Sequence, residues 1–316
     1  MHSTTRGKRF FAVTIMIASV LSFYNCNSGG GSTNSNNIVV NPIPDTGQMA
    51  SYTNTYGEDS DYTINPPLYV DNGDGTITDE VTGLIWQKQD DGLFRTWNDA
   101  NGYCANLSLS GVGWRLPAIF ELIGITDYSI ISWPTISSNY FPNTQATYYW
   151  SDTTGTWSSI PWGVLFNGGV TGFTAYPAGS LTRCVRGLKN NSVFSKNGDG
   201  TVADLSTNLI WQKQDDGIVK SWEQALIYCE GLSLGNFTDW RLPNVKELNS
   251  IVDFTSSNPS INATYFPNAQ PAYYWTSTTN ANSSASAFLV AFGSGMTSGT
   301  YAKTSFHYTR CVRGGL

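Results

Sequence analysis

The heptapeptide Trp86-Gln-Lys-Gln-Asp-Asp-Gly92 occurs twice in this chain, because residues 211–217 repeat it letter for letter. The motifs around it also return in the same order, roughly 125 residues further on. They are Asn-Gly-Asp-Gly-Thr at 72–76 and 197–201, Arg-Leu-Pro at 115–117 and 241–243, Tyr-Tyr-Trp at 148–150 and 273–275, and Thr-Arg-Cys-Val-Arg-Gly at 182–187 and 309–314. The chain therefore contains two copies of one module.

The repeat predicts the domain organisation. Its period is far longer than the roughly 20–50 residues of solenoid repeats, so each copy is expected to be a complete domain with its own core. A length of 316 residues also suggests about two domains. We expect the first domain over residues 67–188 and the second over residues 189–316.

The amino terminus has the pattern of an export signal. Three basic residues within 6–9 precede a mostly apolar stretch over 10–23, which is shorter than the about 20 residues that span a membrane. Cys26 then stands where the signal of a bacterial lipoprotein has its acylated cysteine. We predict a signal peptide over residues 1–25, a lipid on Cys26 and a place in the cell envelope, at the outer membrane or the cell surface. An ordinary secretory signal is the alternative.

Residues 26–66 show no apolar periodicity and are rich in Asn, Ser, Thr, Gly and Pro. This composition is typical of a flexible linker. We therefore predict a tether that carries the first domain away from the membrane.

The five cysteines divide between the copies. Cys104 and Cys184 lie in the first copy, Cys229 and Cys311 lie in the second, and Cys26 is left over. An even set of cysteines in an exported protein predicts disulfides. We expect the pairs Cys104–Cys184 and Cys229–Cys311, each closing a loop of about 80 residues.

The periodicity within each copy predicts an α+β fold. Trp97, Ala100 and Cys104 share one face of a helix that starts at a capping box. A second helix is expected from near Pro117, where proline suits the first turn. Short strands separated by glycine turns are expected at 68–70, 76–78, 84–87, 148–151, 163–167, 171–176 and 182–186, and at the matching positions of the second copy.

In this order the motifs resemble the Lcl C-terminal domain family, which is named for a collagen-like bacterial adhesin. The resemblance covers about 71–187 and 196–314. It implies two tandem C-type lectin-like domains, each with two helices and a twisted antiparallel sheet, in a surface-exposed module that is not an enzyme. In the collagen-like adhesin the module is linked to binding of sulfated polysaccharides, but the collagen region is absent from this chain.

Catalysis is not indicated by the residue types. The two histidines are His2, in the signal, and His307, in the second copy, so a repeated histidine base or metal site is not expected. The Arg-Leu-Pro motif and a following Glu also resemble formylglycine-generating enzymes, which need reactive or metal-bound cysteines. That enzyme type is kept as a remote alternative. The net charge of −6 disfavours nucleic acid as a partner.

A calcium site is considered at the repeated acidic pair. Asp90 and Asp91 return as Asp215 and Asp216, and Ca²⁺ prefers carboxylate ligands. The alternative is a solvated loop before a helix, whose positive amino-terminal end favours anions. The loop that begins at Asp71 has Gly at two positions where an EF-hand loop has oxygen ligands, so it is expected to be a turn.

Two arginine motifs are expected to form ion pairs. Arg115 and Glu121, which both recur in the second copy, are expected to tie down the second helix. Arg183 and Arg186 flank the cysteine of the last strand and are expected to share one of its faces. They could form an anion site, or pair with Asp79 or with the acidic loops.

Recognition is expected in the hairpins after the aromatic strand, where the copies diverge most. Trp157, Trp162 and Phe173 lie there, and variable aromatic loops on a fixed scaffold commonly bind ligands. Ordinary hairpin packing is the alternative for each ring. Tyr148 and Tyr273, which belong to the repeated motif, are expected in the core.

The sequence as a whole predicts an exported, lipid-anchored protein that binds rather than catalyses. We expect an adhesin for a glycan or a matrix protein, in which two domains on one chain raise avidity. A structural or partner-binding envelope lipoprotein is the alternative. No cofactor is expected apart from Ca²⁺ at the acidic pairs.

Overall fold

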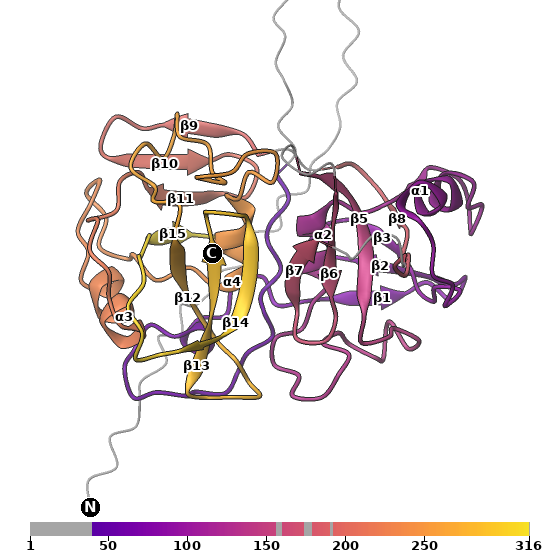
Figure 1. Ribbon diagram of the computed structural model, residues 1–316, viewed down its shortest axis with the longest axis horizontal. Coiled ribbons are helices and arrows are strands. Elements are labelled where there is room, and N and C mark those ends of the chain that lie inside the picture. Colours follow the sequence, from indigo (N-terminus) through magenta and orange to yellow (C-terminus); the bar gives the residue numbers. More distant parts are fainter. Residues whose placement is uncertain (1–39, 156–159, 174–178, 190–191, 316) are drawn as a thin grey trace, which may run out of the picture. The chain divides into compact units, whose positions relative to one another are not determined.

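The structure is a computed structural model that describes residues 40–155, 160–173, 179–189 and 192–315. These residues belong to one compact unit (Figure 1). The predicted signal peptide, Cys26 and Trp157 lie outside the described residues. No helix within them combines the length and the apolar character needed to cross a membrane.

The first repeat contains two antiparallel sheets. Five short strands form one sheet in the order β1-β2-β3-β8-β4, and the other has the order β5-β6-β7. The elements are β1 (Tyr69–Asp71), β2 (Thr76–Asp79), β3 (Ile85–Gln87), α1 (Trp97–Ala105), β4 (Trp114–Arg115), α2 (Ile119–Gly124), β5 (Tyr148–Thr154), β6 (Pro161–Leu165), β7 (Val170–Phe173) and β8 (Val185–Arg186).

The second repeat follows the same plan. Its sheets have the orders β15-β11-β10-β9 and β12-β13-β14, and an isolated bridge from Arg241 to Val312 stands where β4 pairs with β8 in the first repeat. The elements are β9 (Phe194–Lys196), β10 (Thr201–Asp204), β11 (Leu209–Gln212), α3 (Trp222–Glu230), α4 (Val245–Ser250), β12 (Tyr273–Thr279), β13 (Ser286–Ala291), β14 (Met296–Ala302) and β15 (Val312–Gly314). The α+β class is as predicted.

Local sequence explains the ends of several elements. The side chain of Thr96 caps α1 and that of Ser221 caps α3, and the predicted capping box is complete at α3. Between β1 and β2, Gly73 and Gly75 have positive φ angles of 75° and 88°, which glycine adopts without steric cost. The carboxylate of Asp74 accepts hydrogen bonds from the backbone N and side chain of the next threonine and so closes this turn.

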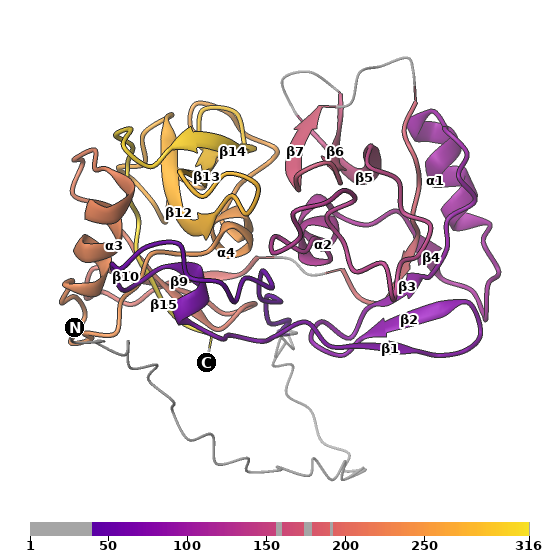
Figure 2. The ribbon, with the colours of Figure 1, turned by 90° about the horizontal axis from the view of Figure 1, so that it is seen from below.

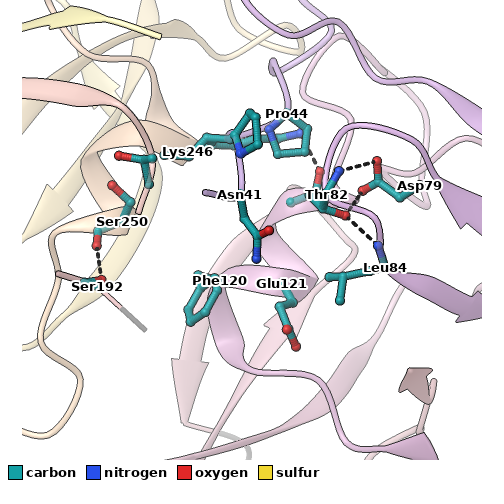
Figure 3. Close-up of a pocket in the computed structure, with 14 residues that line it drawn as sticks. Asn41, Pro44, Asp79, Thr82, Leu84, Phe120, Glu121, Ser192, Lys246 and Ser250 are labelled. Atoms are coloured by element: carbon teal, nitrogen blue, oxygen red, sulfur yellow. Dashed lines mark hydrogen bonds between the residues drawn. The ribbon is translucent and has the colours of Figure 1, made fainter. Parts of the chain in front are cut away.

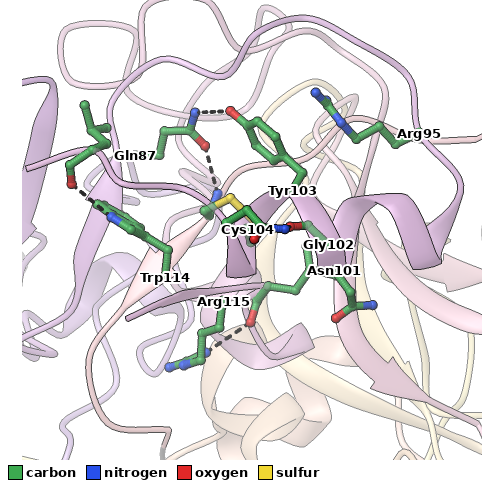
Figure 4. The surroundings of a disulfide bond; sticks show 12 residues. Gln87, Arg95, Asn101, Gly102, Tyr103, Cys104, Trp114 and Arg115 are labelled. Carbon is green, nitrogen blue, oxygen red and sulfur yellow. Dashed lines mark hydrogen bonds between the residues drawn. A yellow bond between two sulfur atoms is a disulfide. The ribbon is translucent and has the colours of Figure 1, made fainter. Parts of the chain in front are cut away.

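Each disulfide joins the first helix of a repeat to the residue directly before its last strand. Cys104 in α1 is bonded to Cys184, and Cys229 in α3 is bonded to Cys311. The side chain of Gln87 in β3 accepts a hydrogen bond from the backbone N of Cys184 and so fixes the strand beside the bridge (Figure 4). Both predicted pairings are confirmed.

The two repeats pack through their second helices and their three-stranded sheets. Helix α2 lies against α4 and β7 beside β14 in the middle of the unit, whereas α1 and α3 lie at opposite outer ends (Figures 1 and 2). The backbone N of Thr297 in β14 donates to Oγ1 of Thr171 in β7 over 2.9 Å. The rings of Tyr128 and Phe288 meet edge to face with centroids 5.0 Å apart.

The hydrophobic core continues across this junction. Phe254 of the second repeat packs in the core of the first repeat. The centroid of its ring lies 5.0 Å from the centroid of the Trp162 ring. Tyr128, Val245 and Phe288 form a further buried cluster drawn from both repeats. The expectation of two domains with separate cores is therefore wrong at the junction, because apolar side chains of each copy are buried against the other.

Residues 40–66, which we call the clasp, are folded against the second repeat and touch the first. A short 3₁₀ helix over Asp59–Asp61 contacts β12, and Asp45, Thr46, Gln48 and Asp59 are buried. The predicted flexible tether over 26–66 is therefore wrong from residue 40 onward. Composition misled here because a polar segment can be held by buried hydrogen bonds instead of by apolar contacts.

Two side chains bond the clasp to both repeats. Nε2 of Gln48 donates to the backbone O of Tyr128 in the first repeat and to that of Thr279 in the second. Nζ of Lys246 in α4 donates to the backbone O of Asp45 and of Gly124, at 2.8 Å each. The clasp therefore helps to set how the repeats meet.

Candidate functional site

The first aspartate of each repeated heptapeptide points into the interior. The carboxylate of Asp90 accepts from Nη2 of Arg183 at 2.8 Å and from Oη of Tyr149 at 2.9 Å. The Asp90 and Arg183 side chains expose 1% and 0% of their surface. Burial lowers the pKa of the Arg183 guanidinium, and the charge of Asp90 opposes that shift. This pair is a buried structural ion pair.

The second aspartate points outward and pairs locally. Asp91 accepts a hydrogen bond from Nη1 of Arg95 at 2.8 Å, four residues on. The second repeat reproduces both pairs, as Asp215 with Arg310 and Asp216 with Lys220.

The predicted calcium site at Asp90, Asp91, Asp215 and Asp216 is therefore wrong. Each carboxylate already has a cationic partner, and the two in one loop point in opposite directions, so they do not converge on a common point. In the described part of the chain, no three His, Cys, Asp or Glu residues are grouped so that they could hold a metal ion.

The pairing of Arg115 with Glu121 is confirmed. The guanidinium donates to both carboxylate oxygens at 2.8 and 2.7 Å, and Glu121 also accepts from the backbone N of Ala118 at the start of α2. Arg241 and Glu247 repeat the arrangement. The bidentate pair fixes where the second helix of each repeat begins.

The expectation that Arg183 and Arg186 share a face is wrong. Arg183 is buried, whereas Nη1 of Arg186 donates to the backbone O of Ser110 at the surface. The residues are three apart, and side chains an odd number apart in a strand point to opposite faces.

The structure tests only one of the three aromatic residues that were predicted to bind a ligand. Trp162 is fully buried and packs in the core, so its assignment to a binding site is wrong. Phe173 ends β7 opposite Trp162, but its side chain lies outside the described residues, as does Trp157.

A groove with a volume of about 540 Å³ lies where the two three-stranded sheets meet; we call it the junction groove. Its lining includes buried residues of both repeats, Tyr128 and Thr171 from the first and Phe288 and Thr297 from the second. Thr171 and Thr297 join β7 to β14, and Tyr128 packs on Phe288 of β13, so the groove is a product of the packing between the copies.

Among the described residues, four rings with accessible surface line the junction groove. Trp133 exposes 60% of its surface and Tyr273 exposes 39%, while Tyr148 and Tyr301 are half-buried. The rings of Tyr273 and Tyr301 lie 4.8 Å apart. Concave surfaces that combine rings with a few polar groups are typical ligand sites.

The expected core position of Tyr148 and Tyr273 is wrong, because both lie at the groove. They stand at the first position of β5 and β12, and the next residue takes the core position instead. Oη of Tyr149 and of Tyr274 bonds to Asp90 and Asp215 respectively.

His307 does not form an acid–base pair with a carboxylate among the described residues. Its ring lies among those of Tyr273, Trp275 and Tyr301, with centroids 5.7, 4.8 and 5.2 Å away. Burial lowers its pKa. The ring of His307 is therefore packed among aromatic side chains beside the groove.

A second cavity, of about 70 Å³, lies between the clasp and the second helices of both repeats (Figure 3). Pro42, Pro44 and Phe120 contribute to its lining, together with Lys246. Burial lowers the pKa of Lys246 to about 8, but its amine is already bonded to two backbone oxygens. We assign this cavity a structural role.

Sequence reasoning missed Trp133, Met296 and Tyr301 as groove residues. Trp133 comes from the first repeat, and Met296 and Tyr301 come from the second. They line one groove only because β7 and β14 pack together. The available signal was general: the groove lies in the hairpin region, where the copies diverge. No sequence pattern indicated that the divergent surfaces face each other.

Comparison with known proteins supports the motif-based resemblance. The chain matches no curated protein sequence. The model of the Lcl C-terminal domain family matches residues 75–186 and again residues 200–313, well over half of the chain. This family points to an exported, binding-type module. The chain belongs to the Lcl C-terminal domain family and carries two copies of that domain.

Proposed function

We propose that the protein is an adhesin-type binding module of the bacterial cell envelope and that its ligand occupies the junction groove. The observation that carries the proposal is that Trp133, Tyr148, Tyr273 and Tyr301 line one concave surface. Ring faces supply large contact areas at little entropic cost, and neighbouring amides and hydroxyls orient the ligand. A glycan or a matrix protein fits such a surface.

The lectin-like fold and the export are part of this proposal. A disulfide from the first helix to the residue directly before the last strand, next to a sheet of hairpins, supports a C-type lectin-like domain in each repeat. Disulfides form in oxidising compartments, which supports export. A lipid on Cys26 would anchor the chain at the outer membrane or the cell surface.

A non-enzymatic role is supported by the side chains that could have acted as acids, bases or nucleophiles. The buried aspartates of the heptapeptides are bonded to arginines. The four cysteines of the repeats are oxidised, which also argues against formylglycine-generating chemistry. Binding is therefore the activity that these groups allow most readily.

An array of glycans and matrix proteins, probed with the purified full chain, tests the proposal. We expect binding that is lost in Trp133→Ala. Phe306→Ala, which removes a ring with 59% exposure outside the groove lining, is the matched control and should bind normally. Undiminished binding by Trp133→Ala would place the ligand elsewhere on the molecule.

A second candidate is a partner-binding envelope lipoprotein without glycan recognition. It is favoured by apolar pairs that are exposed at the same place in both repeats, Leu93 and Phe94 with 59% and 56% exposure and Ile218 and Val219 with 60% and 42%. Each pair follows an acidic loop that is fixed by ion pairs. Protease treatment of intact cells separates the candidates, because an adhesin must be digested and an inward-facing protein is protected.

A further inference from the structure

The junction groove carries no ionised side chain among its described lining residues. Its polar side chains are amides and hydroxyls, including those of Asn167, Asn280, Asn282, Ser294, Ser298 and Thr300. Sulfated or uronic-acid chains are held by Lys and Arg, which pair with anionic groups. The net charge of −6 adds a general repulsion of polyanions. The groove is therefore poorly suited to an anionic chain.

The groove is well suited to neutral sugar rings. One face of many pyranose rings presents C–H groups, which pack on an aromatic face, while the hydroxyls at the edge of the sugar bond to amides and hydroxyls. Trp133 supplies an accessible ring from the first repeat, and Tyr273 and Tyr301 supply rings from the second. A chain of sugar units can contact both repeats at once.

A peptide fits the same surface less well. Extended peptides are commonly bound by adding a strand to a free sheet edge. The sheet edges at the groove are β7 and β14, which lie beside each other. The backbone N of Thr297 in β14 is already bonded to Thr171 in β7. The groove thus offers side chains and not a strand edge.

The junction groove is built from one face of each repeat, although the module occurs twice. Trp133 precedes Pro134, and the matching dipeptide of the second repeat is Asn258-Pro259, so the most exposed ring of the groove has no aromatic counterpart. The lining combines residues 128–171 with residues 273–301. Both repeats are needed for one site, which differs from two equal sites that act by avidity.

Resting on the proposed binding function, we infer that the junction groove binds an uncharged polysaccharide at one site per molecule. The ligand is an extended chain of neutral sugar units that lies across both repeats. The hydroxyls of the sugars bond to the groove amides and hydroxyls, and their apolar faces pack on Trp133 and Tyr301.

Matched polysaccharide pairs test this inference in calorimetric titrations of the purified full chain. The probes are neutral glucans, mannans and galactans, each with its sulfated derivative, for example dextran with dextran sulfate. We expect a neutral member to bind with an affinity that is nearly the same at low and high salt, since no ion pairs form. Oligosaccharides of the same sugar should give one site per chain.

Three variants locate the site. Trp133→Ala, in the first repeat, and Tyr301→Ala, in the second, should each lower the affinity about tenfold or more, as aromatic truncations at the centre of a binding site do. Phe306→Ala should leave it unchanged. Because Trp133 is 60% exposed, its replacement leaves the core intact, and circular dichroism checks the fold of every variant.

The outcomes separate this inference from the function on which it rests. Salt-dependent binding of the sulfated derivatives alone, or binding of a matrix protein alone, would overturn the inference and keep the binding function. Two equal sites per chain would overturn the single composite site. Failure of all glycans and matrix proteins to bind would overturn both proposals.

Discussion

At the scale of single residues, two buried arginines hold the repeated heptapeptides in place. Arg183 donates to the backbone O of Gln87 and of Lys88 and to the carboxylate of Asp90. Arg310 makes the same three kinds of contact in the second repeat. The heptapeptide is therefore retained in both copies as part of the scaffold and not as a metal site.

Replacement of Arg183 by Met tests this role. The substitution leaves the carboxylate of Asp90 buried without its charged partner, and loss of one member of a buried pair typically costs about 3–5 kcal/mol of stability. We expect a fall of this size in urea unfolding. Lys88→Met removes a partly exposed partner of Asp71 instead and should change stability little. Equal effects of the two substitutions would contradict the assignment.

Asp59 in the clasp predicts a dependence of stability on pH. Burial, with a further contribution from Asp45, raises the pKa of Asp59 from 3.8 to about 8. The folded state therefore keeps this proton over a range in which the unfolded state has lost it. Stability from Asp59 is fully present below its unfolded pKa and is lost as the pH rises toward 8. The raised pKa of Asp45, about 6, acts in the same direction.

Asp59→Asn should remove part of this pH dependence. The amide keeps an oxygen that can accept the hydrogen bonds now donated by Thr46 and Thr278, and it does not ionise. In urea unfolding at pH 5, 6.5 and 8, we expect the variant to gain stability relative to the native chain as the pH rises. Glu80→Gln, at an exposed position, is the control. A difference that stays constant from pH 5 to 8 would show that Asp59 is already ionised.

At the scale of elements, the sequence predicted what the repeat and local rules determine. The capping residues Thr96 and Ser221, the turn after β1, both disulfides and the tie between Arg115 and Glu121 all depend on short-range patterns or on cysteine counting. The clasp could not be predicted in this way. Its stabilising hydrogen bonds, such as those of Gln48, reach residues that are far away in the sequence.

Gln48→Ala tests whether the clasp fixes the junction. The amide of Gln48 donates to both repeats and accepts from the backbone N of Thr279. Its loss leaves buried backbone groups without partners, which costs about 1–3 kcal/mol for such a group. We expect a lower urea midpoint and a weaker affinity for the groove ligand. Gln89→Ala, at an exposed position, should change neither.

At the scale of the whole molecule, duplication produced one unit and not two independent domains. The sequence showed that the module is present twice, but it could not show that Phe254 completes the core of the first repeat. The junction groove could not be predicted from the sequence for the same reason. Trp133 and Tyr301 are distant in sequence and become neighbours of one hollow only through tertiary packing.

Calorimetry tests the single unit. Because the core continues across the junction and the clasp bonds to both repeats, we expect one thermal unfolding transition whose van't Hoff and calorimetric enthalpies agree. Two resolved transitions, one for each repeat, would mean that the junction contributes little and that the copies fold separately.

The most direct test of a ligand site built from both copies is an NMR titration with the neutral polysaccharide, observing methionine methyl groups and tryptophan indoles together. Met296 lines the groove and exposes 39% of its surface, while Met49 exposes 81% outside the lining and serves as an internal reference. We predict that Met296, from the second repeat, and Trp133, from the first, shift together with one dissociation constant while Met49 does not move. Ligand binding that leaves Met296 or Trp133 unshifted would contradict a groove shared by the two repeats.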